Sequence, residues 1–170
     1  MLKFLAFMLL GLSPLWPLGD NPLPGDPFVI INKSTNELTL IDDNRVQTVI
    51  SVATGKRDEL TPEGLFTVTV KAENPYYRKK NIMGGDSKNP LGTRWIGFDA
   101  EGTDGRTYGI HGTNNPASIG HYVSEGCVRM QNEVIESIFQ TVPLGTKVLI
   151  TDSKQGSEAL AIEYGAINHE

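Results

Sequence analysis

The chain has 170 residues, of which 39% are hydrophobic and 21% charged, and 15 Lys and Arg against 20 Asp and Glu give a net charge of −5. Length and composition fit one globular domain and exclude a mainly disordered chain. The acidic balance argues against nucleic-acid binding, which draws its affinity largely from dense positive charge. With 18 glycines and 10 prolines, we expect many turns and a mainly β fold.

The N-terminal segment, residues 1–19, has the pattern of an export signal. Lys3 precedes the apolar run from Phe4 to Leu12, which is shorter than the ~20 residues that a membrane-spanning helix needs. We therefore expect an exported chain in which this segment is either cleaved or retained as a membrane anchor. The alternative is an apolar tail that packs on the domain. Residues 20–27 contain three prolines and are predicted to be a linker.

The catalytic region is predicted to span residues 28–151 and to contain short strands. The segments Phe28–Ile31 and Glu37–Ile41 flank a polar turn and predict a hairpin, and a second turn at Asp42–Asn44 precedes a third strand. Such closely spaced strands indicate a barrel or sandwich. The remaining predicted strands are Val46–Ala53, Leu65–Val70, Arg94–Phe98, Tyr108–His111 and Thr146–Thr151.

One helix is predicted downstream of Cys127. Asn132 is its expected N-cap, and Pro143 and Gly145 end it. Its apolar stripe, with the spacing of one helix face, consists of Val134, Ile135, Ile138, Phe139 and Val142. Residues 71–91 are predicted to be a long loop, either a binding lid or simply mobile. Residues 152–170 show no strong period and are predicted to be a C-terminal tail.

Cys127 is the only cysteine, so it cannot form an internal disulfide. It is a buried filler, an intermolecular link or a reactive thiol. A neighbouring positive charge or hydrogen-bond donor would lower the thiol pKa and favour the thiolate. A protonated His111, Arg129 and local backbone N–H groups are the available sources. Gly126 permits a positive φ and a close approach of a carbonyl substrate to backbone N–H groups, which could hold an oxyanion. His121, in a turn-rich segment, and His169, in the tail, are weaker candidates for the base.

No metal or cofactor site is predicted, because three scattered histidines lack the spacing of metal ligands and the chain has neither a phosphate loop nor a dinucleotide fingerprint.

The segment from Tyr108 to Met130 resembles the signature of the L,D-transpeptidase catalytic (YkuD-type) domain family. Upstream, Thr54-Gly55-Lys56 and the segment Thr61–Phe66 are similar to two further motifs of that family. The resemblance covers about residues 28–151. The matching signature residues are His111-Gly112-Thr113, Ile119-Gly120, Ser124 and Gly126-Cys127-Val128-Arg129-Met130.

The resemblance implies an L,D-transpeptidase-like β-barrel or sandwich with one main helix after the nucleophile. By resemblance, Cys127 is the nucleophile, His111 the general base and later acid, and the carbonyl of Gly112 the group that orients the imidazole. Arg129, with Gly126 and Ser124, is expected to bind substrate or support the oxyanion site. Glu125 stands where the family more often has His, which leaves substrate preference open.

The implied reaction is acyl transfer in the cell wall. Cys127 attacks the carbonyl after meso-diaminopimelate, or a similar L-centre, in a peptidoglycan tetrapeptide stem; D-Ala leaves, and the thioester passes the acyl group to an amine or to water. Peptidoglycan stem peptides are therefore the expected partners, and cross-links the product. A carboxypeptidase side activity follows when water is the acceptor.

Three alternatives stay open at this stage. A sortase-like transpeptidase also uses His, Cys and Arg, but usually with its His far upstream of the Cys and its Arg well downstream. A cysteine peptidase of the NlpC type places its Cys before its His, the reverse of Cys127 and His111. The non-enzymatic alternative is a cell-wall-binding module that has kept the fold, which an unreactive thiol would support.

Overall fold

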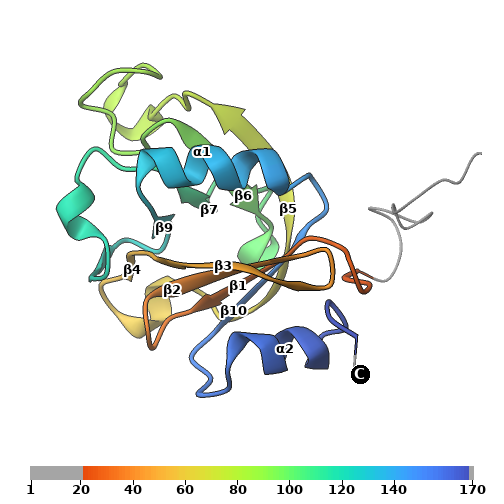
Figure 1. Cartoon of the computed structure of the whole chain (residues 1–170). Helices are drawn as coiled ribbons and strands as arrows, with labels where there is room; N and C mark the ends of the chain where they lie inside the picture. Colours follow the sequence, from red (N-terminus) through yellow and green to blue (C-terminus); the bar gives the residue numbers. More distant parts are fainter. Residues whose placement is uncertain (1–20, 169–170) are drawn as a thin grey trace, which may run out of the picture.

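The computed structural model describes residues 21–168, so the predicted export segment 1–19 and His169 lie outside the described residues. Within this range, eight strands form one curved sheet in the order β3-β2-β1-β10-β5-β6-β7-β9, and β4 pairs with β8 (Figure 1). The mainly β fold is confirmed. The strands are β1 (Phe28–Asn32), β2 (Glu37–Asp42), β3 (Arg45–Ser51), β4 (Thr54–Gly55), β5 (Gly64–Glu73), β6 (Arg94–Phe98), β7 (Tyr108–His111), β8 (Tyr122–Ser124), β9 (Val128–Arg129) and β10 (Lys147–Thr151).

Two helices pack on opposite sides of the sheet (Figure 1): α1 (Asn132–Thr141) and α2 (Ser157–Glu163). Four short 3₁₀ turns complete the described part: η1 (Asp58–Leu60), η2 (Arg78–Lys80), η3 (Ala100–Gly102) and η4 (Pro116–Ser118). No helix within residues 21–168 has the length and apolar character needed to cross a membrane.

The central strands are apolar on both faces because each face is covered. In β1, Val29 and Ile31 belong to the core under α1, whereas Phe28 and Ile30 belong to a second core under α2. Successive side chains of a strand point to opposite faces, so an uninterrupted apolar run is what a doubly covered strand requires. The parallel pairing of β1 with β10 places both strands between the two cores.

The predicted strands are confirmed, with differences at their ends. The hairpin of β1 and β2 pairs Phe28 with Ile41, and Asp43 and Asn44 form the next turn with positive φ. β3 ends at Ser51 rather than at the predicted Ala53, which instead pairs with Arg129. β5 continues to Glu73, so the start of the predicted loop 71–91 is a strand. β4, β8 and β9 are two or three residues long, too short to show a period in the sequence, and are additional to the predicted strands.

Two helical predictions are corrected. Asn132 is the first residue of α1, and the N-cap is Gln131. Instead of capping the helix, Asn132 Oδ1 accepts hydrogen bonds from Thr93 N and Thr113 N. The predicted tail contains α2, so the chain has a second helix besides the expected one.

Residues near both ends of the described chain belong to the fold. Leu160, Ala161, Ala166 and Ile167 are buried in the second core. The predicted linker 20–27 touches the same region, where the Gly25 N–H donates to the carbonyl of Ala166 at 3.4 Å.

Removing the side chain of Leu160, which is 4% exposed in the second core, should destabilise the protein. Leu160→Ala is expected to lower the free energy of unfolding by about 3 kcal/mol, because it removes buried methyl groups and leaves a cavity. Leu144→Ala is the matched control, since Leu144 is 50% exposed and should cost less than about 0.5 kcal/mol. Urea denaturation measures both; equal losses would show that α2 does not pack on the sheet in solution.

Candidate active site

Three site residues lie in one row across neighbouring strands. Trp95 of β6 is the register partner of His111 of β7, and His111 is the register partner of Arg129 of β9. In the adjacent row, Ile110 pairs with Val128, and both side chains are fully buried in the core under α1. Alternation along the strands therefore sends the apolar row into the core and the Trp, His and Arg row to the opposite face.

The ring of His111 is held from two directions. It is only 4% exposed, its Nδ1 lies 2.6 Å from the carbonyl oxygen of Gly112, and its ring stacks on that of Trp95 with centroids 5.6 Å apart. A carbonyl oxygen only accepts hydrogen bonds, so in the neutral ring Nδ1 carries the proton and Nε2 is left as a proton acceptor. The expected orientation of the imidazole by Gly112 is present in the structure.

The turn after His111 is tied to the start of α1. Asn132 Oδ1 accepts from Thr113 N at 3.1 Å and from Thr93 N at 3.3 Å. A Cβ on Gly112 would collide with Asn132 Oδ1. A residue with a side chain at position 112 would therefore displace either Asn132 or the carbonyl that orients His111.

The turn before Cys127 is constrained at each backbone group of Gly126. This glycine has φ +132°, and a Cβ there would collide with the carbonyl oxygen of Leu60. Its N–H donates to Ser124 Oγ at 3.1 Å and its carbonyl accepts from Thr61 Oγ1 at 3.0 Å. The positive φ expected at Gly126 is found, but its N–H is engaged by Ser124 and is not free to hold an oxyanion.

The upstream motifs meet at the Cys127 turn. Thr61 Oγ1 also accepts a hydrogen bond from the N–H of Gly55 at 2.9 Å, and Lys56 N donates to the carbonyl of Ser124 at 2.9 Å. Gly55, Lys56 and Thr61, which are far from Cys127 in the sequence, thereby support the turn that carries the thiol.

Cys127 itself is half-buried. Its Sγ lies 3.5 Å from the carbonyl oxygen of Thr107, and it precedes β9 by one residue. Cys127 and Arg129 are two residues apart, so the alternation of side chains along β9 and the residue before it places both on the same face of the sheet, the face that also carries His111. The thiol lines a cavity of about 340 Å³, so it is open to a ligand from one side.

The electrostatics of this site correct one expectation. Burial lowers the pKa of His111 to about 4, an effect that the charge of Arg129 adds to and that backbone hydrogen bonds to Gly112 and Leu91 oppose. Burial also raises the pKa of the Cys127 thiol, against smaller lowering effects from the Gly109 backbone, Lys79 and Arg129. At neutral pH both groups are therefore uncharged. The expected imidazolium that lowers the thiol pKa is absent because desolvation disfavours both charged forms.

The cavity beside Cys127 has an apolar interior and is walled by the long loop. The loop residues Tyr77, Arg78 and Lys79 contribute to its lining, and buried Asn89 anchors the loop by donating to the carbonyl of Pro75 at 2.8 Å. Of the two roles considered for this loop, its position favours binding. The apolar lining includes Val70, Ala72, Pro75, Leu91 and Trp95.

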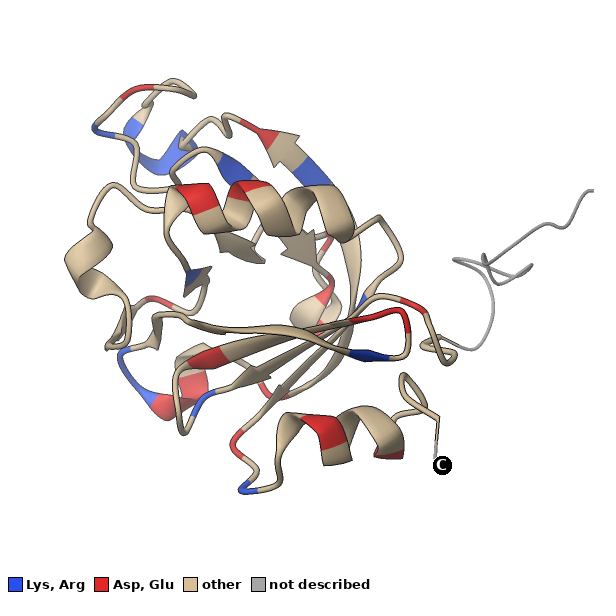
Figure 2. Ribbon diagram, in the orientation of Figure 1, with Lys and Arg blue, Asp and Glu red and all other residues tan. Residues whose placement is uncertain are grey.

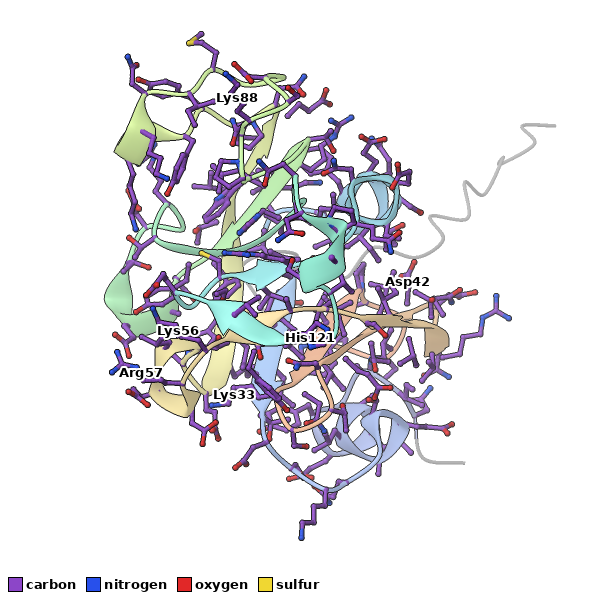
Figure 3. All side chains as sticks on the ribbon, turned by 90° about the vertical axis from the view of Figure 1, so that its left-hand side faces the viewer. Lys33, Asp42, Lys56, Arg57, Lys88 and His121 are labelled. Carbon is purple, nitrogen blue, oxygen red and sulfur yellow. The ribbon has the colours of Figure 1, made fainter. Side chains whose placement is uncertain are left out.

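The other candidate residues lie apart from this row. His121 is exposed in the loop before β8 (Figure 3). Glu125 is exposed, and its carboxylate pairs with Lys56 Nζ at 2.5 Å, which lowers the pKa of Glu125. Within residues 21–168, no three His, Cys, Asp or Glu side chains gather in a way that could hold a metal ion.

Sequence reasoning missed three supporting residues: Trp95, Asn132 and Thr61. Trp95 was placed on a strand, but no sequence pattern shows that its partner across the sheet is His111. Asn132 was interpreted as a helix cap because Asn is common there. Thr61 lies in one of the motif segments, and that resemblance is the signal that could have singled it out.

Comparisons with known proteins agree with the family resemblance of the segment from Tyr108 to Met130. The family model described as the L,D-transpeptidase catalytic domain matches residues 26–150. YqjB of Bacillus subtilis (strain 168), which is assigned as an L,D-transpeptidase, is 65% identical over 164 residues, covering 96% of this chain and 93% of that protein.

Solved structures are similar in fold. A mutant L,D-transpeptidase of Enterococcus faecium has a TM-score of 0.60 at 23% identity over 75% of this chain and 50% of that chain. L,D-transpeptidase 3 of Mycobacterium tuberculosis, in complex with a faropenem-derived adduct, has a TM-score of 0.59 at 19% identity over 75% and 60%. This chain thus spans one half to three fifths of those chains, and the likeness establishes the fold.

Alkylation of Cys127 should report a thiol that is neutral at pH 7. Because burial raises the thiol pKa, the rate of iodoacetamide alkylation is expected to rise with pH, and the midpoint of this rise should lie above the ordinary thiol pKa of ~8.5. His111→Ala should not raise this value further, since a neutral ring contributes no positive charge, and His121→Ala should leave it unchanged. Intact-mass measurement across a pH series gives the rates; an apparent pKa near 6 would instead indicate a thiolate–imidazolium pair.

Proposed function

Because the chain belongs to the L,D-transpeptidase catalytic domain family, we propose that it cross-links peptidoglycan stem peptides through a thioester on Cys127. The observation that carries this proposal is the placement of Cys127, His111 and Arg129 on one face of the sheet, with the thiol at the cavity wall. Family membership favours this reaction over a sortase-like one. A non-catalytic wall-binding module is the remaining alternative, and it predicts an unreactive thiol.

The first half of the proposed reaction acylates the enzyme. Nε2 of neutral His111 takes the proton of the Cys127 thiol as the sulfur attacks the donor carbonyl after the L-centre of the tetrapeptide stem. The C–N bond to D-Ala then breaks, and the imidazolium returns its proton to the leaving amine. The low pKa of His111 makes its imidazolium a stronger acid than the protonated leaving amine, which favours this proton return.

The second half releases the product. An acceptor amine attacks the thioester carbonyl and His111 removes a proton from that amine. The C–S bond then breaks, and His111 returns the proton to the sulfur, which regenerates the neutral thiol. The product is an amide cross-link between two stems. When water replaces the amine, the same steps hydrolyse the thioester, which accounts for a carboxypeptidase side activity.

We assign the oxyanion of each tetrahedral intermediate to the N–H of Cys127 and the positive charge of Arg129. Support for Arg129 comes from its register pairing with His111 and from the effect of its charge on the pKa values of both His111 and Cys127. Ser124 and Gly126 then act indirectly, because their mutual hydrogen bond shapes the turn that presents the thiol.

We also propose that the protein acts outside the cytoplasmic membrane. The apolar run in residues 4–12 after Lys3 supports export, and the proposed substrate is part of the cell wall. Cleavage of this segment gives a secreted enzyme, and its retention gives an anchored one.

Cys127 should be the site of acylation. Incubation with a carbapenem, which acylates an active thiol through its strained ring, is expected to add one covalent adduct to the intact protein. Peptide mapping should place the adduct on Cys127, and Cys127→Ala should give none. An adduct that persists in Cys127→Ala would contradict the assignment, and an unmodified wild type that also fails to turn over tetrapeptide would support the non-catalytic module.

Arg129→Lys should lower turnover without loss of stability. The guanidinium has no carboxylate within 4 Å in the described part of the chain, so no ion pair is lost, whereas Lys offers one charged centre in place of a planar donor set. We expect kcat to fall by about tenfold, the loss of roughly one charge-assisted hydrogen bond, with an unchanged melting temperature. Steady-state kinetics and thermal melting measure these; equal kcat values would rule out the proposed role.

A further inference from the structure

Two cations of the long loop face the cavity that contains the thiol. Arg78 and Lys79, both in η2, line the cavity together with Cys127, and Arg106 completes its set of charged lining residues. Among the described residues, no carboxylate side chain belongs to this lining. Figure 2 shows Lys and Arg gathered on this loop, at the upper left. The local charge is therefore opposite in sign to the net charge of −5 of the chain.

The charges of Arg78 and Lys79 are not neutralised by neighbours. Arg106 pairs with Asp104 at 2.5 Å, whereas neither Arg78 nor Lys79 forms an ion pair within residues 21–168. The carboxylate of Glu125, two residues before Cys127, pairs with Lys56 at 2.5 Å.

The charge of Lys79 acts on the turn that carries the thiol. Its positive charge lowers the pKa values of both Cys127 and Glu125, so its ammonium lies within electrostatic range of the turn that carries the thiol. The loop that carries it is fixed, because Tyr77 and Ile82 exchange two backbone hydrogen bonds and Asn89 is buried. A fixed cation at the rim of an apolar cavity attracts an anion that has an apolar body.

We propose that Lys79, with Arg78, forms a carboxylate-binding subsite that selects acyl donors carrying a carboxylate near the reacting carbonyl. The apolar lining accommodates the carbon skeleton of the donor while the two cations hold its charge. The identity of the donor rests on the proposed function, but the selection for an anion beside the thiol does not. Arg129, which does not line the cavity, is left to act on the oxyanion.

Two alkylating reagents test the subsite without any assumption about the reaction catalysed. Iodoacetate carries a carboxylate and iodoacetamide its neutral counterpart; in each case the thiolate of Cys127 forms an S–C bond as the C–I bond breaks and iodide leaves. The ratio of the two rates cancels any change in thiol pKa, because both reagents consume the same thiolate.

We expect Lys79→Gln to lower the iodoacetate-to-iodoacetamide ratio by about three- to tenfold, the effect of removing one charge within several ångströms. Lys80→Gln is the matched control, since Lys80 is in the same turn but does not line the cavity, and its ratio should stay at the wild-type value. High salt should bring the wild-type ratio toward that of Lys79→Gln. Equal ratios in wild type and Lys79→Gln, or equal losses in the two variants, would overturn the subsite.

A kinetic experiment then connects the subsite to the donor. Tetrapeptide donors ending in a free carboxylate or in a carboxamide are compared in wild type, Lys79→Gln and Lys80→Gln. Lys79→Gln should raise KM about fivefold for the carboxylate donor and leave the carboxamide donor unchanged. An equal rise for both donors would refute carboxylate recognition. Absence of wild-type turnover would instead refute the proposed function, while the alkylation ratio still decides on the anion subsite.

Discussion

His111 carries a titratable ring on β7, between β6 and β9, and removing that ring from water costs its charged form more free energy than its neutral form. Its pKa of about 4 follows mainly from this desolvation. Much of the surrounding structure keeps the ring in place: Trp95 stacks on one side, Gly112 accepts from Nδ1, and Asn132 fixes the turn that bears this carbonyl. The base of the proposed reaction is therefore a neutral ring of fixed orientation rather than a member of a preformed ion pair.

The same constraint changes how the nucleophile is activated. In the proposed reaction, a thiol with a raised pKa stays protonated until a carbonyl substrate is present, so its proton moves to His111 during attack and not before it. Such a thiol is less exposed to adventitious alkylation or oxidation, which follow the thiolate fraction. The positive charges of Arg129 and Lys79 oppose the effect of burial and favour the negative charge that develops on sulfur and oxygen.

The position of these groups relies on two packed cores. One lies between the sheet and α1 and holds Ile110 and Val128, the residues adjacent to His111 and Arg129. The other lies under α2 and includes residues of β1 and β10. β5 pairs with β10 and leads into the loop that carries Arg78 and Lys79. A rigid sheet thus supports the base on one strand and the cationic wall of the cavity on a loop anchored nearby.

Most of the strands, helix α1 and the family could be predicted from the sequence alone. Local patterns of apolar residues and turns predicted most strands and α1, because these depend on neighbours along the chain. The motif around Cys127 identified the family, since its residues lie close together in sequence. Tertiary structure decided what depends on distant partners: the stacking of Trp95 on His111, the support of Gly126 by Thr61, and the docking of α2. It also decided the charge states of His111 and Cys127, because desolvation depends on what surrounds a side chain in space, and no sequence pattern records that.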